Sequence, residues 1–92
     1  MHHHLVELSP GDIVELDYAY VEERIDIEVH GPWLYLRAPG KYARALQRAN
    51  DLQLRGWLVL QWTPAQLRAR PWAIARRIDE VRRARRAALT AA

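Results

Sequence analysis

The sequence predicts a single α/β domain whose elements follow the order β-β-β-α-β-α-α around a mixed sheet. Three observations lead to this fold class. Apolar and polar residues alternate with a period of two in the first third of the chain, which is typical of strands. Two later segments, residues 41–55 and 72–89, have helical periodicity. Between them, residues 57–62 form an almost continuous apolar run, which is typical of a strand covered on both faces.

Length and composition limit the size of the domain and its surroundings. A chain of 92 residues, 50% of them hydrophobic, suffices for one small domain with a modest core, so we expect a homodimer or a larger assembly. The chain has no cysteine, which excludes a disulfide framework and a thiolate metal site. No apolar run approaches the ~18 residues of a membrane span. We therefore expect a cytoplasmic protein without a membrane partner.

Charge is divided unevenly along the chain. Residues 1–30 contain eight acidic residues and one basic residue, whereas residues 31–92 contain three acidic and thirteen basic residues, twelve of them arginine. The two parts therefore carry formal charges of −7 and +10, which add up to the net charge of +3. This asymmetry indicates a site for a cation in the first part and for a polyanion in the second. An arginine-rich face that is simply solvated is the alternative.

The strands at the start of the chain hold the candidate chemical site. Residues 4–8, 13–20 and 25–30 alternate as a three-stranded meander, with Glu22 and Glu23 at the centre of its second turn. In that register Asp17 lies directly opposite Glu28, with Cβ atoms about 4.5–5.5 Å apart. Two carboxylates at this distance repel each other. We therefore expect a bound cation, a shared proton, or a solvated face on which water screens the charges.

The crossover helix over residues 41–55 has a clear apolar stripe, and Gly56 stands where a C′ glycine should close it. The stripe consists of Tyr42, Ala45, Leu46, Ala49 and Leu52. The spacing of Thr63 and Gln66 predicts a capping box at the start of a short helix. Pro71 then starts the final basic helix. Core positions are expected for Trp57, Trp62 and Trp72.

Several basic and aromatic residues are candidates for contacts with nucleic acid. Arg44 and Arg48 fall on the side of the crossover helix opposite its stripe, and the final helix adds a basic face that includes Arg82 and Arg83. Such side chains are suited to phosphate groups. Trp33 can stack on a base or wedge into a duplex, with coverage of the core as the alternative.

Two segments carry a resemblance to a known family. They are residues 28–31, EVHG, and residues 48–63, RANDLQLRGWLVLQWT. The first is similar to an E-x-D-G or T-H-G element, and the second to the pattern R-x-N-x-L-x-L-x-G-W-x-V-L-x-(F/W)-T. Both occur in the very-short-patch-repair-like (Vsr-like) endonuclease branch of the PD-(D/E)XK nuclease superfamily. The likeness covers about residues 12–82 and implies a small restriction-endonuclease-like core.

The resemblance implies an enzyme that hydrolyses DNA phosphodiester bonds with the help of a metal ion. Asp17 and Glu28 would hold Mg²⁺ or Mn²⁺, since a hard cation prefers oxygen ligands. The ion would stabilise charge on the phosphate and lower the pKa of the attacking water. His30 takes the position of the family's lysine and would orient the water or transfer a proton.

The sequence also departs from the family, and the departures define an alternative. It leaves no room for the family's helix ahead of the first catalytic strand, and His30 stands where an acid is common. Ala45 replaces an acid of the crossover helix. The alternative is a truncated, catalytically decayed relative that binds nucleic acid without cutting it, or that serves as a subunit of a larger complex.

Overall fold

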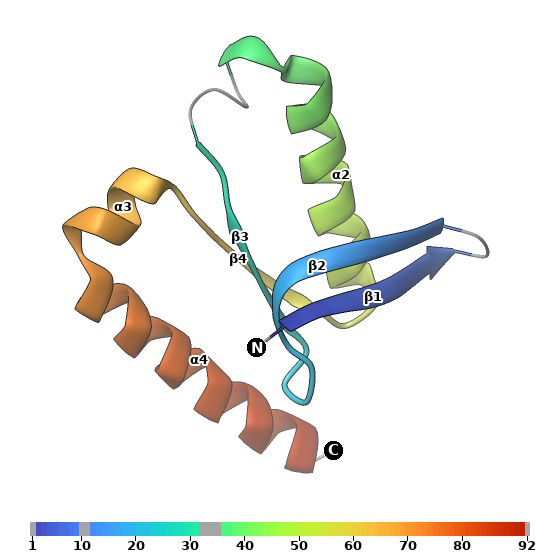
Figure 1. Cartoon of the computed structure of the whole chain (residues 1–92). Helices are drawn as coiled ribbons and strands as arrows, with labels where there is room; N and C mark the ends of the chain where they lie inside the picture. Colours follow the sequence, from blue (N-terminus) through green and yellow to red (C-terminus); the bar gives the residue numbers. More distant parts are fainter. Residues whose placement is uncertain (1, 10–11, 32–35, 92) are drawn as a thin grey trace.

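The described part of the chain has the predicted order of elements. The computed structural model describes the backbone of residues 2–9, 12–31 and 36–91, and the side chains of residues 18–31 and 36–91. Its strands and helices follow the order β-β-β-α-β-α-α, with antiparallel and parallel pairs in the same sheet (Figure 1). The prediction of an α/β fold with a mixed sheet is therefore confirmed.

Four strands form the sheet, in the spatial order β1-β2-β3-β4. Their bounds are β1 His2–Ser9, β2 Asp12–Tyr20, β3 Ile25–Val29 and β4 Leu58–Trp62. β1, β2 and β3 are consecutive antiparallel neighbours, as expected of a meander. β4 pairs in parallel with β3 and lies at the edge of the sheet. A parallel neighbour requires a crossover connection, and the intervening helix supplies it.

The helices lie on opposite faces of the sheet (Figure 1). They are α2 Pro39–Leu54, the short α3 Pro64–Ala69 and the long α4 Pro71–Ala91. Leu52 of α2 packs with Ala19, whereas Arg82 of α4 lies over the ring of the next residue, Tyr20. Because successive side chains of a strand point to opposite faces, the two helices cover different sides. No described helix combines the length and apolar character that crossing a membrane requires.

The β2–β3 hairpin has the register that its alternation predicts. Tyr18 pairs with Ile27, Ala19 with Asp26 and Tyr20 with Ile25, around a turn over residues 21–24. In this register the next step would bring Asp17 opposite Glu28. The recorded pairing of β2 with β3 ends one step earlier, at Tyr18 and Ile27.

The end of α2 anchors the core through a Schellman motif. The Gly56 N–H donates to the Gln53 carbonyl at 3.1 Å, and the Trp57 N–H donates to the Leu52 carbonyl at 3.0 Å. Gly56 has φ +87°, a left-handed conformation that favours glycine, as predicted for a C′ residue. The motif brings Trp57 back onto Leu52, and both join Ala19 in the buried cluster.

Two core expectations for the second half of the chain are wrong. β4 is half-buried instead of covered on both faces, and Gln61 is exposed, because β4 is an edge strand whose partners lie on one side only. Trp72 is 81% exposed, since it occupies the outer side of the first turn of α4, where Ile74 faces inward instead. The capping box of Thr63 and Gln66 is confirmed in both of its hydrogen bonds.

Arginines of α4 fix this helix to the β2–β3 turn through Glu23. The Glu23 side chain is 3% exposed, and its Oε1 accepts from Arg86 Nη2 at 2.5 Å and from Arg82 Nη2 at 3.3 Å. Its carbonyl oxygen accepts from Arg85 Nε at 2.9 Å, and Arg85 Nη2 also donates to the Gly56 carbonyl. The hydrogen bond from Arg86 holds the pKa of the Glu23 carboxyl below its ordinary value of 4.5, although burial opposes this shift.

Glu23→Gln should lower the free energy of unfolding at neutral pH by about 1–2 kcal/mol, because α4 loses its anionic anchor. A depressed folded-state pKa stabilises the fold above pH 4.5, and this contribution disappears as pH falls through the folded-state pKa. Urea titrations from neutral to acidic pH should therefore show a smaller loss of stability in the variant than in the wild type.

Glu22→Gln is the matched control for this prediction, since Glu22 is an exposed acid in the same turn. It should leave both the stability and its pH dependence close to the wild type. Equal behaviour of the two variants would contradict the anchoring role of Glu23.

Candidate functional site

The acidic face of β3 is buried under α2. Asp26 and Glu28 alternate along the strand and share one face, and they are 0% and 6% exposed. Asp26 is paired with Ala19, which packs against Leu52 of α2, so this face points towards the helix. Of the three alternatives for the Asp17–Glu28 pair, a solvated face is therefore wrong for Glu28. The sequence pattern could not reveal it, because the polar side of the hairpin is covered by a helix that follows later in the chain.

Glu28 forms an ion pair with Arg48. Its Oε1 accepts a hydrogen bond from Arg48 Nη2 at 2.7 Å, and the two side chains are 8% and 33% exposed. The prediction that Arg48 lies on the outer side of the crossover helix is therefore wrong. The physical reason is that Arg48 and Leu52 are four residues apart, so that both face the sheet from adjacent turns. The guanidinium group of Arg48 thus supplies a positive charge beside the Glu28 carboxylate, a charge that the sequence analysis expected from a bound cation.

Potential metal ligands are few among the side chains that the structure describes. No group of three or more histidine, aspartate or glutamate side chains in the described ranges is arranged to hold a metal ion. One oxygen of Glu28 is already bonded to Arg48, and a metal ion would compete with that guanidinium. The side chain of Asp17, the other predicted ligand, lies outside the described residues. No catalytic step through a metal is derived from this geometry.

His30 lies directly after β3, at the end of the sheet where β3 and β4 finish. It is half-buried, and its backbone N–H donates to the Trp62 carbonyl at 3.0 Å, which extends the parallel pairing by one step.

Two of the predicted phosphate contacts on α4 are engaged within the chain. Arg82 contacts Glu23, and its guanidinium carbon lies 4.0 Å from the ring centroid of Tyr20. Arg83 pairs with Asp79 one turn earlier in the same helix. Arg82 is therefore committed to holding α4 in place, whereas the Arg83 pair is solvent-exposed.

The other predicted contacts lie elsewhere. Arg44 is exposed on α2, and Trp33 lies outside the described residues. The structure does not bring Arg44 together with the arginines of α4, since α2 and α4 lie on opposite faces of the sheet (Figure 1).

A set of exposed arginines on α3 and the first two turns of α4 forms what we call the arginine surface. None of their guanidinium groups makes an ion pair or a hydrogen bond with any residue that the structure describes. The members are Arg68, Arg70, Arg76 and Arg77. The sequence contains a signal for this surface, because residues 52–78 include five arginines and no aspartate or glutamate.

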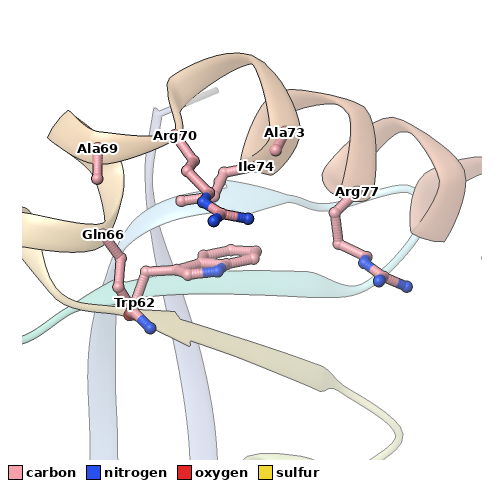
Figure 2. Close-up of a pocket in the computed structure, with 7 residues that line it drawn as sticks. All are labelled: Trp62, Gln66, Ala69, Arg70, Ala73, Ile74 and Arg77. Carbon is pink, nitrogen blue, oxygen red and sulfur yellow. The ribbon is translucent and has the colours of Figure 1, made fainter.

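A groove lies beside this surface, between the end of β4 and the α3–α4 junction (Figure 2). Its volume is about 490 Å³. We call it the Trp62 groove, after the half-buried indole on its floor. The lining residues are Trp62, Gln66, Ala69, Arg70, Ala73, Ile74 and Arg77. The sequence assigned Trp62 to the core and therefore missed the groove.

Comparison with known proteins finds no match for this chain among family models, curated proteins or solved structures. The proposals below accordingly depend on the geometry and chemistry of the chain's own residues.

Arg48→Ala should lower the free energy of unfolding by roughly 2–3 kcal/mol, because it leaves the buried Glu28 carboxylate without its cation. Arg44→Ala, which removes an exposed arginine from the same helix, should change it by less than about 0.5 kcal/mol. Urea denaturation of both variants at neutral pH tests this. Similar values for the two would contradict a stabilising role for the Glu28–Arg48 pair.

Proposed function

We propose that the chain binds nucleic acid through the arginine surface and does not cleave it. The observation that carries this proposal is the set of four exposed guanidinium groups without acidic partners on α3 and the start of α4. Unpaired arginines are available to phosphate oxygens, which they bind with two parallel hydrogen bonds. Residues 64–91 contain eight arginines and only two acids, Asp79 and Glu80, so this part of the chain attracts a polyanion.

Exposed aromatic side chains favour nucleic acid over an acidic protein as the polyanion. Trp72 is 81% exposed and lies between Arg70 and Arg76 in the sequence. Aromatic rings interleaved with arginines are typical of surfaces that bind single strands, because bases stack on the rings while the cations bind phosphates. DNA is the partner that we propose.

Reversing two charges of the arginine surface should weaken DNA binding. Arg68→Glu combined with Arg76→Glu removes two phosphate contacts, so the slope of log K against log salt concentration should become shallower by about 2. Fluorescence anisotropy of labelled single-stranded and duplex DNA over a series of salt concentrations measures this slope. The two residues do not line the Trp62 groove, so the result is independent of it.

The matched control is Arg44→Glu combined with Arg83→Glu, which changes the net charge equally on other parts of the surface. This control should keep most of the wild-type affinity and slope. An equal loss in both double variants would attribute binding to net charge alone, and no binding by the wild type would contradict the proposed function.

A metal-dependent DNA endonuclease of the Vsr-like class is the second candidate. One observation favours it: the hairpin register, continued by one step, brings Asp17 opposite Glu28, with His30 two residues further along the chain. In this proposal Asp17 and Glu28 would hold Mg²⁺ or Mn²⁺, and His30 would take part in proton transfer. The Glu28–Arg48 pair argues against it, since the ion would have to replace that guanidinium.

A nicking assay separates the two candidates. We expect supercoiled DNA incubated with the wild-type protein and Mg²⁺ or Mn²⁺ to remain as intact as in EDTA. Metal-dependent nicking that disappears in Glu28→Gln, but persists in the exposed-acid control Glu22→Gln, would contradict this expectation and establish the endonuclease. Circular dichroism of both variants confirms that the comparison is made between folded proteins.

A homodimer in the cytoplasm is the assembly that we propose for either function. Large apolar side chains are exposed on the described surface, with Leu54 82% and Leu36 70% accessible. The buried cluster around Leu52 and Trp57 is small, so a second copy would cover apolar area that the monomer leaves in water.

A further inference from the structure

The Trp62 groove combines an aromatic surface with two cations, which is an unusual lining for a gap in a core. The indole of Trp62 lies on the floor, with Arg70 and Ile74 above it and Arg77 reaching down from the following turn of α4 (Figure 2). Ile74 is 8% exposed and closes the inner end, whereas Arg70 and Arg77 are exposed. The groove is therefore apolar inside and cationic at its mouth.

The two cations at the mouth are available to a ligand. The guanidinium groups of Arg70 and Arg77 make no ion pair or hydrogen bond within the described part of the chain. This distinguishes them from Arg82 and Arg86, which bind Glu23. Two arginines that line the same groove and form no ion pair with any described residue are suited to a phosphate group.

Gln66 adds a polar group at the edge of the indole. Its Oε1 accepts the Thr63 N–H at 2.9 Å in the capping box, which fixes the position of the amide. The amide nitrogen makes no hydrogen bond with the described residues and remains available as a donor. A planar ring stacked on Trp62 would present its edge to this amide.

We propose that the Trp62 groove binds one nucleotide, with the base stacked on the Trp62 indole and the phosphate held by Arg70 and Arg77. Aromatic stacking together with arginine contacts is the common way of binding an unpaired base. The volume of about 490 Å³ falls within the usual range for small-ligand sites. The inference rests on the proposed function and deepens it, because the nucleotide would belong to a single strand that crosses the arginine surface.

Other classes of ligand would use only one part of the groove, either its two arginines or its apolar residues. A carboxylate or an acidic peptide would use the two arginines but would leave the indole face without a planar partner. An apolar ligand would use Trp62 and Ile74 but would desolvate two unpaired guanidinium groups at the mouth. A nucleotide satisfies both parts at once.

The test is a titration of the folded chain followed by NMR through its four indole N–H signals. Deoxyadenosine monophosphate should shift the Trp62 signal in a saturable way and leave Trp57 unchanged, since Trp57 is buried on the opposite face of the sheet. In the titration with the mononucleotide, Trp72, which is exposed and does not line the groove, serves as the comparison for stacking outside the groove. Deoxyadenosine and inorganic phosphate, titrated separately, should each bind at least roughly tenfold more weakly.

Variants of the groove make the assignment of roles falsifiable. Arg70→Gln combined with Arg77→Gln should weaken binding of deoxyadenosine monophosphate by roughly tenfold while the affinity for deoxyadenosine changes little. Arg44→Gln combined with Arg83→Gln, two exposed arginines outside both the groove and the arginine surface, is the matched control and should keep the wild-type affinity for deoxyadenosine monophosphate. Trp62→Leu should lose binding of both the nucleotide and the nucleoside, and unchanged signals of Trp57 verify that it is folded.

The outcomes separate the groove from the proposed function. Saturable shifts of Trp62 with the mononucleotide and with a short oligodeoxyadenylate support both. Binding of the oligonucleotide without any shift of Trp62 overturns the groove and leaves the nucleic-acid proposal intact. Binding of the mononucleotide without any affinity for the oligonucleotide overturns the nucleic-acid proposal. Equal shifts of Trp62 and Trp72 in the titration with the mononucleotide would mean stacking that does not require the groove and would overturn the nucleotide site.

Discussion

The position of α4 depends on one buried carboxylate, that of Glu23. This side chain sits in the β2–β3 turn and accepts hydrogen bonds from Arg82 and Arg86, which lie 59 and 63 residues further along the chain. Ile74 is the one residue of α4, which is described throughout, that is buried, so apolar packing of the helix is limited. A radius of gyration of 14.0 Å, against about 12 Å expected for this length, agrees with a loosely packed arrangement. Electrostatic contacts thus place the helix that forms one wall of the Trp62 groove.

The arginines of this chain fall into two groups with different physical roles. Arg48, Arg82 and Arg86 reach buried carboxylates and hold the helices against the sheet. Arg68, Arg70, Arg76 and Arg77 remain exposed and form no ion pair with any residue whose side chain the structure describes. The net charge of +3 does not reveal this division, because it adds up paired and unpaired charges alike. The unpaired group is what remains for a polyanion.

Local patterns in the sequence were sufficient for the strands, the register of the β2–β3 hairpin, the end of α2 and the start of α3. The period-two alternation around Glu22 and Glu23 predicts the hairpin register, and Gly56 and the capping box at Thr63 predict helix ends that the structure confirms. These signals succeed because each involves residues only a few positions apart.

The parts that the sequence did not reveal depend on contacts between distant residues. Arg48 lies at the edge of the helical stripe, so only the position of Glu28 on the sheet decides which way it points. The partners of Glu23 are separated from it by most of the chain. The sequence predicts core positions for both Trp62 and Trp72. In the structure Trp62 lines the groove and Trp72 is exposed, and this difference depends on the position of the junction between α3 and α4.

The peptide group of Gly56 has a consequence for how the chain unfolds. Its N–H completes the end of α2, and its carbonyl oxygen accepts from Arg85 of α4, so helices on opposite faces of the sheet share one residue. Fraying of α2 would withdraw the acceptor from α4, and detachment of α4 would remove a support from the turn that ends α2. Local opening on either face is thereby transmitted to the other, and the small domain gains cooperativity that its limited core alone would not provide.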